Sequence, residues 1–186
     1  MFMKHFYKDI PGFFSFKSIY DECLLKIKDN GVWVEIGSWQ GRSIAYAVVE
    51  SIILNKNINF TVVDIWYLSP KHYNETLKSD NDLYNEFIKN ISSIKNKINI
   101  CKEDSSSSAR HFKDNSVDVC MIDANHAYES VLKDINAWYP KIKKGGILIG
   151  DDCTKDFPGV EKAIKAFTKE RDLSYQIKDG CWILYL

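Results

Sequence analysis

The sequence has no excess of charge of either sign. Its 186 residues include 25 Lys and Arg and 25 Asp and Glu, so the formal net charge is zero. No segment is a basic arm or an acidic tail. Because proteins that bind nucleic acids through phosphate contacts need clustered lysine and arginine, we expect no nucleic-acid partner.

Long apolar runs and paired cysteines are also missing. No stretch reaches the roughly 18 apolar residues that a membrane-spanning helix needs, and the opening MFMKHFYKDIPGFF has no signal-peptide core. The five cysteines are odd in number and include no CxxC pair, which disfavours both a disulfide framework and a zinc site. We therefore expect buried free thiols, no membrane partner and a reducing, cytoplasmic location.

Apolar strands alternate with amphipathic helices along most of the chain. The strand-like runs are Val32–Ile36, Phe60–Ile65, Ile98–Cys101, Val117–Ile122 and Gly146–Ile149. The helical stretches are Arg42–Leu54, Asp82–Ile94, Tyr128–Tyr139 and Val160–Glu170. Continuous apolar runs are typical of strands that are covered on both faces. The alternation therefore predicts an α/β fold with a parallel sheet and right-handed crossovers.

The C-terminal residues depart from this alternation. Two apolar runs, Leu173–Ile177 and Cys181–Leu186, flank an Asp-Gly pair that is typical of a hairpin. We therefore predict a Rossmann-like, seven-stranded, mostly parallel sheet with helices on both faces and a C-terminal antiparallel hairpin. At this length one domain over residues 1–186 is expected, with an N-terminal helical cap (1–30) and a lid-like segment (66–79).

A glycine-containing turn follows the first predicted strand. The strand ends in Glu35 and continues through Gly37 and Gly41 into a helix. Glycines permit a tight turn and close backbone approach, and the helix start offers free N–H groups. The spacing is GxxxG rather than the GxGxxG of a dinucleotide loop, and Glu35 disfavours a pyrophosphate. The turn suits a cationic or amine-bearing ligand, or it is a strand–helix connection without a ligand.

Carboxylates follow three other predicted strands. Asp64 stands where a carboxylate binds the ribose hydroxyls of adenosine ligands. Asp123 and the pair Asp151-Asp152 end two further strands, and neighbouring parallel strands end about 5 Å apart. Carboxylates so placed repel one another unless a cation or amine compensates. Oxygen ligands favour Mg²⁺; the alternative is that some of these residues cap helices or face solvent.

One histidine lies close to this group. His126 is three residues beyond Asp123, just past the predicted strand end. It is a candidate general base or ligand contact. The alternative is a packed or helix-capping histidine.

Together these residues resemble class I S-adenosylmethionine-dependent methyltransferases, in the form used by cephalosporin-hydroxylase-like and macrocin-type O-methyltransferases. The matching stretches, which place the resemblance over residues 10–186, are Ile10–Gly12, Glu35–Ser43, Asp123–Tyr128 and Gly145–Asp152. Trp39 departs from the generic pattern, which has a small residue there.

The resemblance implies a set of binding residues. Glu35 and Gly37 would line the methionine end of the cofactor, Asp64 would hold the ribose, and Asp104-Ser105 would flank the adenine. The remaining positions implied for the cofactor are Ser38, Gly41, Ser43, Trp66 and Asp123. Metal-dependent members hold Mg²⁺ at the positions of Asp123, Asp151 and Asp152, whereas other members use no metal.

The implied activity is O-methylation of a hydroxylated small molecule or sugar. The methyl carbon of a sulfonium is already electrophilic, so the enzyme must align the acceptor and remove its proton. Mg²⁺ would lower the pKa of the acceptor hydroxyl, and Asp123 or His126 would take the proton. We expect the acceptor pocket to form from residues 66–79 and from Phe13, Phe14 and Phe16; the alternative is that these three phenylalanines belong to the hydrophobic core.

Two alternatives remain at this point. One is a nicotinamide-dependent dehydrogenase, against which the missing GxGxxG and the terminal hairpin count. The other is a cofactor-binding module without catalysis, against which the set of Asp123, Asp151 and Asp152 counts. The sequence identifies neither the methyl acceptor nor the oligomeric state, a homo-oligomer included.

Overall fold

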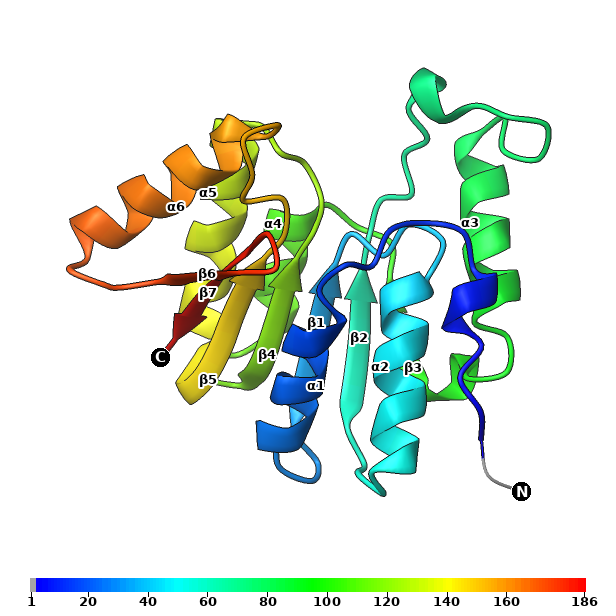
Figure 1. The fold of residues 1–186 in the computed structure, drawn as a ribbon, viewed down its shortest axis with the longest axis horizontal. Coiled ribbons are helices and arrows are strands. Elements are labelled where there is room, and N and C mark those ends of the chain that lie inside the picture. The colour runs from blue at the N-terminus through cyan, green and yellow to red at the C-terminus, as the bar shows by residue number, and fades with distance from the viewer. Residues whose placement is uncertain (1–2) are drawn as a thin grey trace.

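A seven-stranded sheet forms the centre of the computed structural model, which describes residues 3–186 (Figure 1). The strands are β1 (Val32–Ile36), β2 (Asn59–Val63), β3 (Ile98–Cys101), β4 (Val117–Ile122), β5 (Ile142–Gly150), β6 (Gln176–Lys178) and β7 (Cys181–Tyr185). Their order is β3-β2-β1-β4-β5-β7-β6. The pairs from β3 to β5 are parallel, and β7 runs antiparallel to both β5 and β6. The predicted sheet and its C-terminal hairpin are confirmed.

Helices connect the strands and cover both faces of the sheet. The α-helices are α1 (Lys17–Lys26), α2 (Arg42–Ile53), α3 (Asp80–Asn90), α4 (Ser105–Ser108), α5 (Tyr128–Trp138) and α6 (Pro158–Glu170). Short 3-10 helices are η1 (Tyr7–Asp9), η2 (Pro70–His72), η3 (Lys95–Lys97), η4 (Ala109–His111) and η5 (Tyr139–Lys141). No helix within residues 3–186 is long and apolar enough to cross a membrane.

Alternate side chains of the central strands enter two separate hydrophobic cores. Trp33 packs with residues of α1, α2 and α3, whereas its neighbour Val34 packs with residues of α5 and α6. Successive side chains of a strand point to opposite faces, so a sheet covered on both faces needs apolar residues at consecutive positions. This explains the unbroken apolar runs in the sequence.

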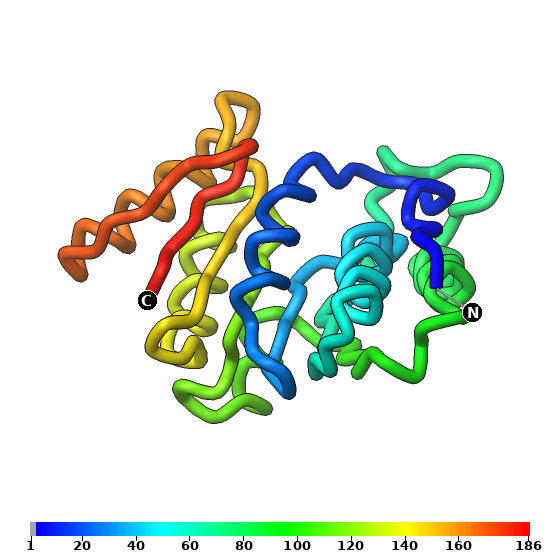
Figure 2. The backbone as a smooth tube through the Cα atoms, turned by 60° about the horizontal axis from the view of Figure 1, so that its bottom comes forward, coloured from blue at the N-terminus to red at the C-terminus, as the bar shows by residue number. Residues whose placement is uncertain are grey.

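The hairpin differs from its predicted boundaries by a few residues. Asp179 and Gly180 have φ angles of 50° and 81°, as a two-residue type I′ turn requires. Lys178 therefore pairs with Cys181 and belongs to β6. Leu173 and Tyr175, expected in the strand, pack against the α5–α6 core instead. Figure 2 shows the red C-terminal strands beside β5, at the end of the sheet away from β3.

Other boundaries shift for local reasons. β5 begins at Ile142 instead of Gly146, because the strand continues through an irregularity in its pairing with β4. β2 ends at Val63 rather than Ile65. Helix α3 starts earlier than expected, at Asp80, because the Ser79 side chain caps its N-terminus.

Two segments lie beside the carboxyl ends of the parallel strands (Figure 1). The chain between η1 and α1 crosses that edge of the sheet, and the Arg42 guanidinium donates a hydrogen bond to the Gly12 carbonyl. Residues 66–79 extend from the end of β2, and Leu68 and Leu77 anchor them in the core. The first segment lies within the predicted N-terminal cap (1–30), and the second is the predicted lid-like segment (66–79).

The hairpin should contribute strongly to stability through Trp182. Its ring is fully buried, and a Cβ on Gly150 would lie 2.2 Å from it. We expect Trp182→Ala to lower the free energy of unfolding by about 3–5 kcal/mol, because large-to-small changes leave a cavity. Ile177→Ala, at a half-exposed position of the same hairpin, should change it by only about 0.5 kcal/mol. Urea unfolding measures both, and equal losses would contradict this account of the hairpin.

Candidate active site

The glycine turn after β1 is shaped by contacts within the protein. Gly37 has a φ of 81°, and a Cβ there would lie 1.8 Å from the carbonyl oxygen of Asp123. A Cβ on Gly41, whose φ is 90°, would lie 2.9 Å from Ile91 Cγ2. Both positions therefore require glycine for packing. The close approach of Gly37 places the end of β1 directly against the end of β4.

Glu35 is a buried carboxylate beneath this turn. Its oxygens accept hydrogen bonds from Tyr20 Oη at 2.7 Å, Ser38 Oγ at 2.8 Å and Ser43 Oγ at 3.0 Å. Burial is the main cause that raises the pKa of Glu35 to about 7, and the three hydroxyl donors partly oppose it. Sequence reasoning missed Tyr20, because nothing near that residue indicates that α1 lies against the end of β1.

Asp64 joins the turn after β1 to the segment after β2. One of its oxygens accepts hydrogen bonds from the backbone N–H groups of Ser38 and Trp39, at 2.9 and 3.0 Å. The other oxygen accepts one from the N–H of Trp66 at 2.7 Å. Burial raises the pKa of Asp64, and these backbone donors oppose the rise. Asp64, predicted to bind the ribose, thus fixes the backbone of the turn after β1 and of the segment after β2.

The two tryptophans beside Asp64 are held in unusual backbone conformations. Trp39 and Trp66 have φ angles of 47° and 50°, in the left-handed region that bulky residues seldom adopt. The Trp66 indole donates a hydrogen bond to the Trp39 carbonyl at 3.0 Å. Its ring is fully buried against Tyr84 and Phe87. Trp66, predicted to bind the cofactor, thus belongs to the core beneath the lid-like segment.

Three carboxylates lie at the ends of β4 and β5. Burial, followed by the neighbouring charges of Asp151 and Asp152, raises the pKa of Asp123 well above its usual range. Asp151 accepts a hydrogen bond from Cys181 Sγ at 3.2 Å, and burial raises the pKa of Asp151 as well. The thiol of Cys181, expected only as a buried free cysteine, is thus a further contact at this edge.

His126 completes the group. Its Nε2 lies 2.8 Å from Asp152 Oδ2, and its ring packs against that of Phe157 at a tilt of 45°, with 4.3 Å between ring centroids. One ligand atom each of Asp123, His126 and Asp152 lies within 4.8 Å of the others. His126 thus lies beside two of the three carboxylates that the sequence analysis predicted as metal ligands.

The predicted adenine contacts lie at the end of β3. Asp104 caps α4 by accepting a hydrogen bond from the Ser107 N–H at 3.1 Å. Hydrogen bonds, first from the Ser106 hydroxyl, lower the pKa of Asp104 to about 2. Ser105 Oγ accepts a hydrogen bond from the Trp138 indole at 3.1 Å. Both side chains therefore have partners within the protein.

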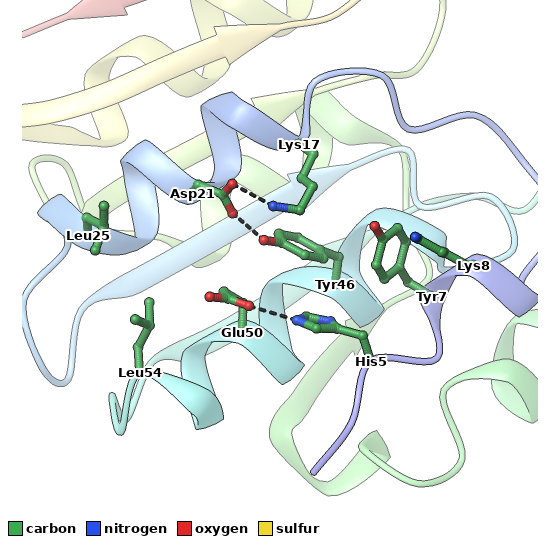
Figure 3. A pocket seen from close by; sticks show the side chains of 9 residues that line it. All are labelled: His5, Tyr7, Lys8, Lys17, Asp21, Leu25, Tyr46, Glu50 and Leu54. Atoms are coloured by element: carbon green, nitrogen blue, oxygen red, sulfur yellow. Dashed lines mark hydrogen bonds and ion pairs between the residues drawn. The ribbon is translucent and has the colours of Figure 1, made fainter. Parts of the chain in front are cut away.

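A cavity of about 480 Å³ lies away from this edge, between the N-terminal segment, α1 and α2 (Figure 3). Its acidic groups already have partners. Glu50 pairs with His5 at 2.7 Å, and Asp21 pairs with Lys17 at 2.6 Å and accepts a hydrogen bond from Tyr46. Because these acidic groups already have partners within the cavity wall, we place the candidate active site at the sheet edge instead.

The sheet edge is negatively charged and lacks compensation. Its five carboxylates are Glu35, Asp64, Asp123, Asp151 and Asp152. No Lys or Arg in the described part of the chain forms an ion pair with any of them, and His126 is the one basic group paired there. Such a site favours a cationic ligand and repels a phosphate.

The fold is that of a class I methyltransferase. Its signs are the strand order, the antiparallel β7 and the carboxylates at the ends of the parallel strands. Residues 34–153 match the model of a methyltransferase domain family, and the chain belongs to that family. Its structure is similar to the O-methyltransferase NovP, with a TM-score of 0.69 and 14% identity, over 90% of this chain and 78% of NovP. It is also similar to CalS11, a TDP-rhamnose 3'-O-methyltransferase, with a TM-score of 0.62 and 13% identity, over 90% of this chain and 76% of CalS11.

A sequence relative comes from Acanthamoeba polyphaga mimivirus. This protein, "Uncharacterized protein R132", is 28% identical over 125 residues, which are 67% of this chain. The match spans 52% of the relative, so the chain covers about half the length of that protein.

The raised pKa of Glu35 predicts a pH-dependent stability. Between about pH 4.5 and pH 7 the folded protein binds a proton at Glu35 that the unfolded chain has released. The free energy of unfolding should therefore fall as the pH rises through this window. Glu35→Gln has no such proton to bind. Its free energy of unfolding should therefore rise relative to that of the wild type, by up to about 3 kcal/mol between about pH 4.5 and pH 7. Urea unfolding at several pH values tests this, and parallel pH profiles would contradict it.

Proposed function

We propose that this protein is an S-adenosylmethionine-dependent O-methyltransferase that acts on a hydroxyl group of a small molecule or sugar. The uncompensated carboxylates at the sheet edge carry the proposal. S-adenosylmethionine presents a sulfonium and an ammonium group, and both are cations that Glu35, Asp123 and their neighbours attract. The family membership and the likeness to O-methyltransferase structures support the same activity.

The same charges disfavour a nicotinamide-dependent dehydrogenase. Its cofactor carries an anionic pyrophosphate beside the turn after the first strand. Here that turn stands over Glu35 and next to Asp64, and neither residue has a Lys or Arg partner in residues 3–186. A binding module without catalysis is less favoured, because cofactor binding alone does not require a histidine beside the carboxylates of Asp123 and Asp152.

The residues divide between binding and catalysis. Bound S-adenosylmethionine supplies an electrophilic methyl group. The Gly37 turn and Asp123 hold its methionine end, Asp64 holds the ribose, and Asp104 with Ser105 borders the adenine. Asp123 and His126 are the groups placed to take the proton of the acceptor hydroxyl as the methyl group transfers.

Aromatic side chains supply the walls for the acceptor. Tyr67 and Tyr73 of the lid-like segment are more than half exposed, and Phe157, which contacts His126, is partly exposed. Phe13 is 99% exposed in the segment that crosses the edge, whereas Phe16 is buried in the core. Of the predicted phenylalanines, Phe13 is therefore free to contact an acceptor.

A divalent cation at this edge is part of the proposal. Asp123 and Asp152 provide oxygen donors there, and Asp151, the third predicted ligand, adds negative charge. Since no Lys or Arg within residues 3–186 pairs with these carboxylates, an ion such as Mg²⁺ would balance their charge. The ion would lower the pKa of the acceptor hydroxyl.

Cofactor binding should depend on Asp64. We expect Asp64→Ala to weaken S-adenosylhomocysteine binding by about tenfold to a hundredfold, because hydrogen bonds to a charged group contribute about 1.5–3 kcal/mol. Asp80→Ala is the matched control. Asp80 likewise accepts a backbone hydrogen bond, from the Leu68 N–H at 2.7 Å, but Asp80 itself directly follows the lid-like segment and is not part of the predicted cofactor site. Calorimetry measures both variants. Unchanged affinity in folded Asp64→Ala would refute the cofactor assignment.

Methyl transfer should require a divalent cation. With a panel of hydroxylated acceptors, EDTA should abolish product formation, and added metal should restore it. Asp152→Asn should lose activity far more than S-adenosylhomocysteine affinity, because the ion acts on the acceptor. Asp156→Asn, in the exposed loop that follows, is the control. Mass spectrometry of the methylated products provides the measurement, and full activity in EDTA would exclude the metal from the mechanism.

A further inference from the structure

The ends of β4 and β5 present one nitrogen and two oxygen donors to a common point. The ligand atoms of Asp123, His126 and Asp152 all lie within 4.8 Å of one another. His126 Nε2 is buried and has no hydrogen-bond partner within residues 3–186. Although this nitrogen lies 2.8 Å from Asp152 Oδ2, the two atoms are not aligned as donor and acceptor. A buried ring nitrogen without a hydrogen bond points to a partner other than a protein atom.

The spacing suits a shared ion. With ligand bonds of about 2.1 Å, two neighbouring donors of an octahedral ion lie roughly 3 Å apart and opposite donors roughly 4 Å apart. The contact between His126 and Asp152 matches the shorter of these separations. A proton shared by the two groups would need a straight hydrogen bond, whereas an ion only needs both donors to point at the same site.

Each donor is held in place by the fold. Phe157 packs against the His126 ring in a tilted contact, and the Gly37 contact fixes the backbone of Asp123. Asp152 has a φ of 58°, a conformation that turns the chain sharply after β5. Asp151, by contrast, accepts a hydrogen bond from Cys181 on the neighbouring strand β7.

We propose that Asp123, His126 and Asp152 bind a divalent first-row transition metal such as Mn²⁺, and that they bind it more tightly than Mg²⁺. Imidazole nitrogen suits first-row transition metals, whereas Mg²⁺ takes oxygen ligands. Asp151 is not a ligand in this arrangement. The inference deepens the proposed function and rests on it for the role of the ion. With His126 bound to the metal, the second carboxylate oxygen of Asp123 is the group left to take the acceptor proton.

A second group of metal-binding residue types does not share these properties. Cys101, Glu103 and His111 also lie within 4.8 Å of one another. However, Glu103 already pairs with Arg110 at 3.1 Å and contacts His111 at the same distance. The guanidinium would repel a cation, so His111 serves as a control.

The test measures metal binding directly, without methyl transfer. Mn²⁺ is titrated into the wild-type protein and followed by electron paramagnetic resonance, with Mg²⁺ as competitor. Pulsed measurements on the wild-type complex should show coupling of Mn²⁺ to a ¹⁴N nucleus. We expect His126→Gln to weaken Mn²⁺ binding by about tenfold or more and to abolish the ¹⁴N coupling. Asp151→Asn and His111→Gln should bind Mn²⁺ as the wild type does.

Several results would overturn the inference. These are no Mn²⁺ binding at millimolar concentration, binding without ¹⁴N coupling, equal competition by Mg²⁺, or a loss of affinity in Asp151→Asn with none in His126→Gln. Calorimetry with S-adenosylhomocysteine on the same samples separates the two proposals. Cofactor binding without Mn²⁺ binding refutes only the metal site, whereas absent cofactor binding refutes the proposed function.

Discussion

The close packing of the Gly37 turn against the Asp123 carbonyl holds the candidate site together. The N–H of Asp123 donates to the Ile36 carbonyl at 2.8 Å, and a Cβ on Gly37 would collide with the Asp123 backbone. The two strand ends can therefore meet only if residue 37 is glycine. This contact places the ends of β1 and β4, which carry Glu35 and Asp123, side by side, so the geometry of the candidate site depends on one backbone approach.

The grouping of carboxylates is the electrostatic consequence of that packing. Burial raises the pKa of Glu35, Asp64, Asp123 and Asp151, and the absence of Lys or Arg partners in the described residues leaves the repulsion unrelieved. Such an arrangement costs folding free energy unless a cation binds. The same cost would be relieved by the proposed sulfonium cofactor and divalent ion, so their binding would stabilise the folded protein.

The loops around the edge are fixed by side-chain hydrogen bonds to the backbone rather than by regular structure. Asp64 binds three N–H groups of two different loops, and the Trp66 indole binds the Trp39 carbonyl. These bonds hold two bulky residues in left-handed conformations that they would otherwise avoid. The exposed aromatic residues Tyr67 and Tyr73 thus extend from a rigid base.

The sheet, the hairpin and the acidic strand ends can be predicted from the sequence, because strand periodicity, an Asp-Gly turn and terminal carboxylates are local patterns. Which side chains meet at the site follows from the folded arrangement instead. Tyr20 in α1 donates a hydrogen bond to Glu35, and Cys181 in β7 donates one to Asp151. His126 lies close to both Asp123 and Asp152. The ring of Trp66 likewise enters the core. These contacts depend on how separate elements pack, and chain spacing carries no information about that.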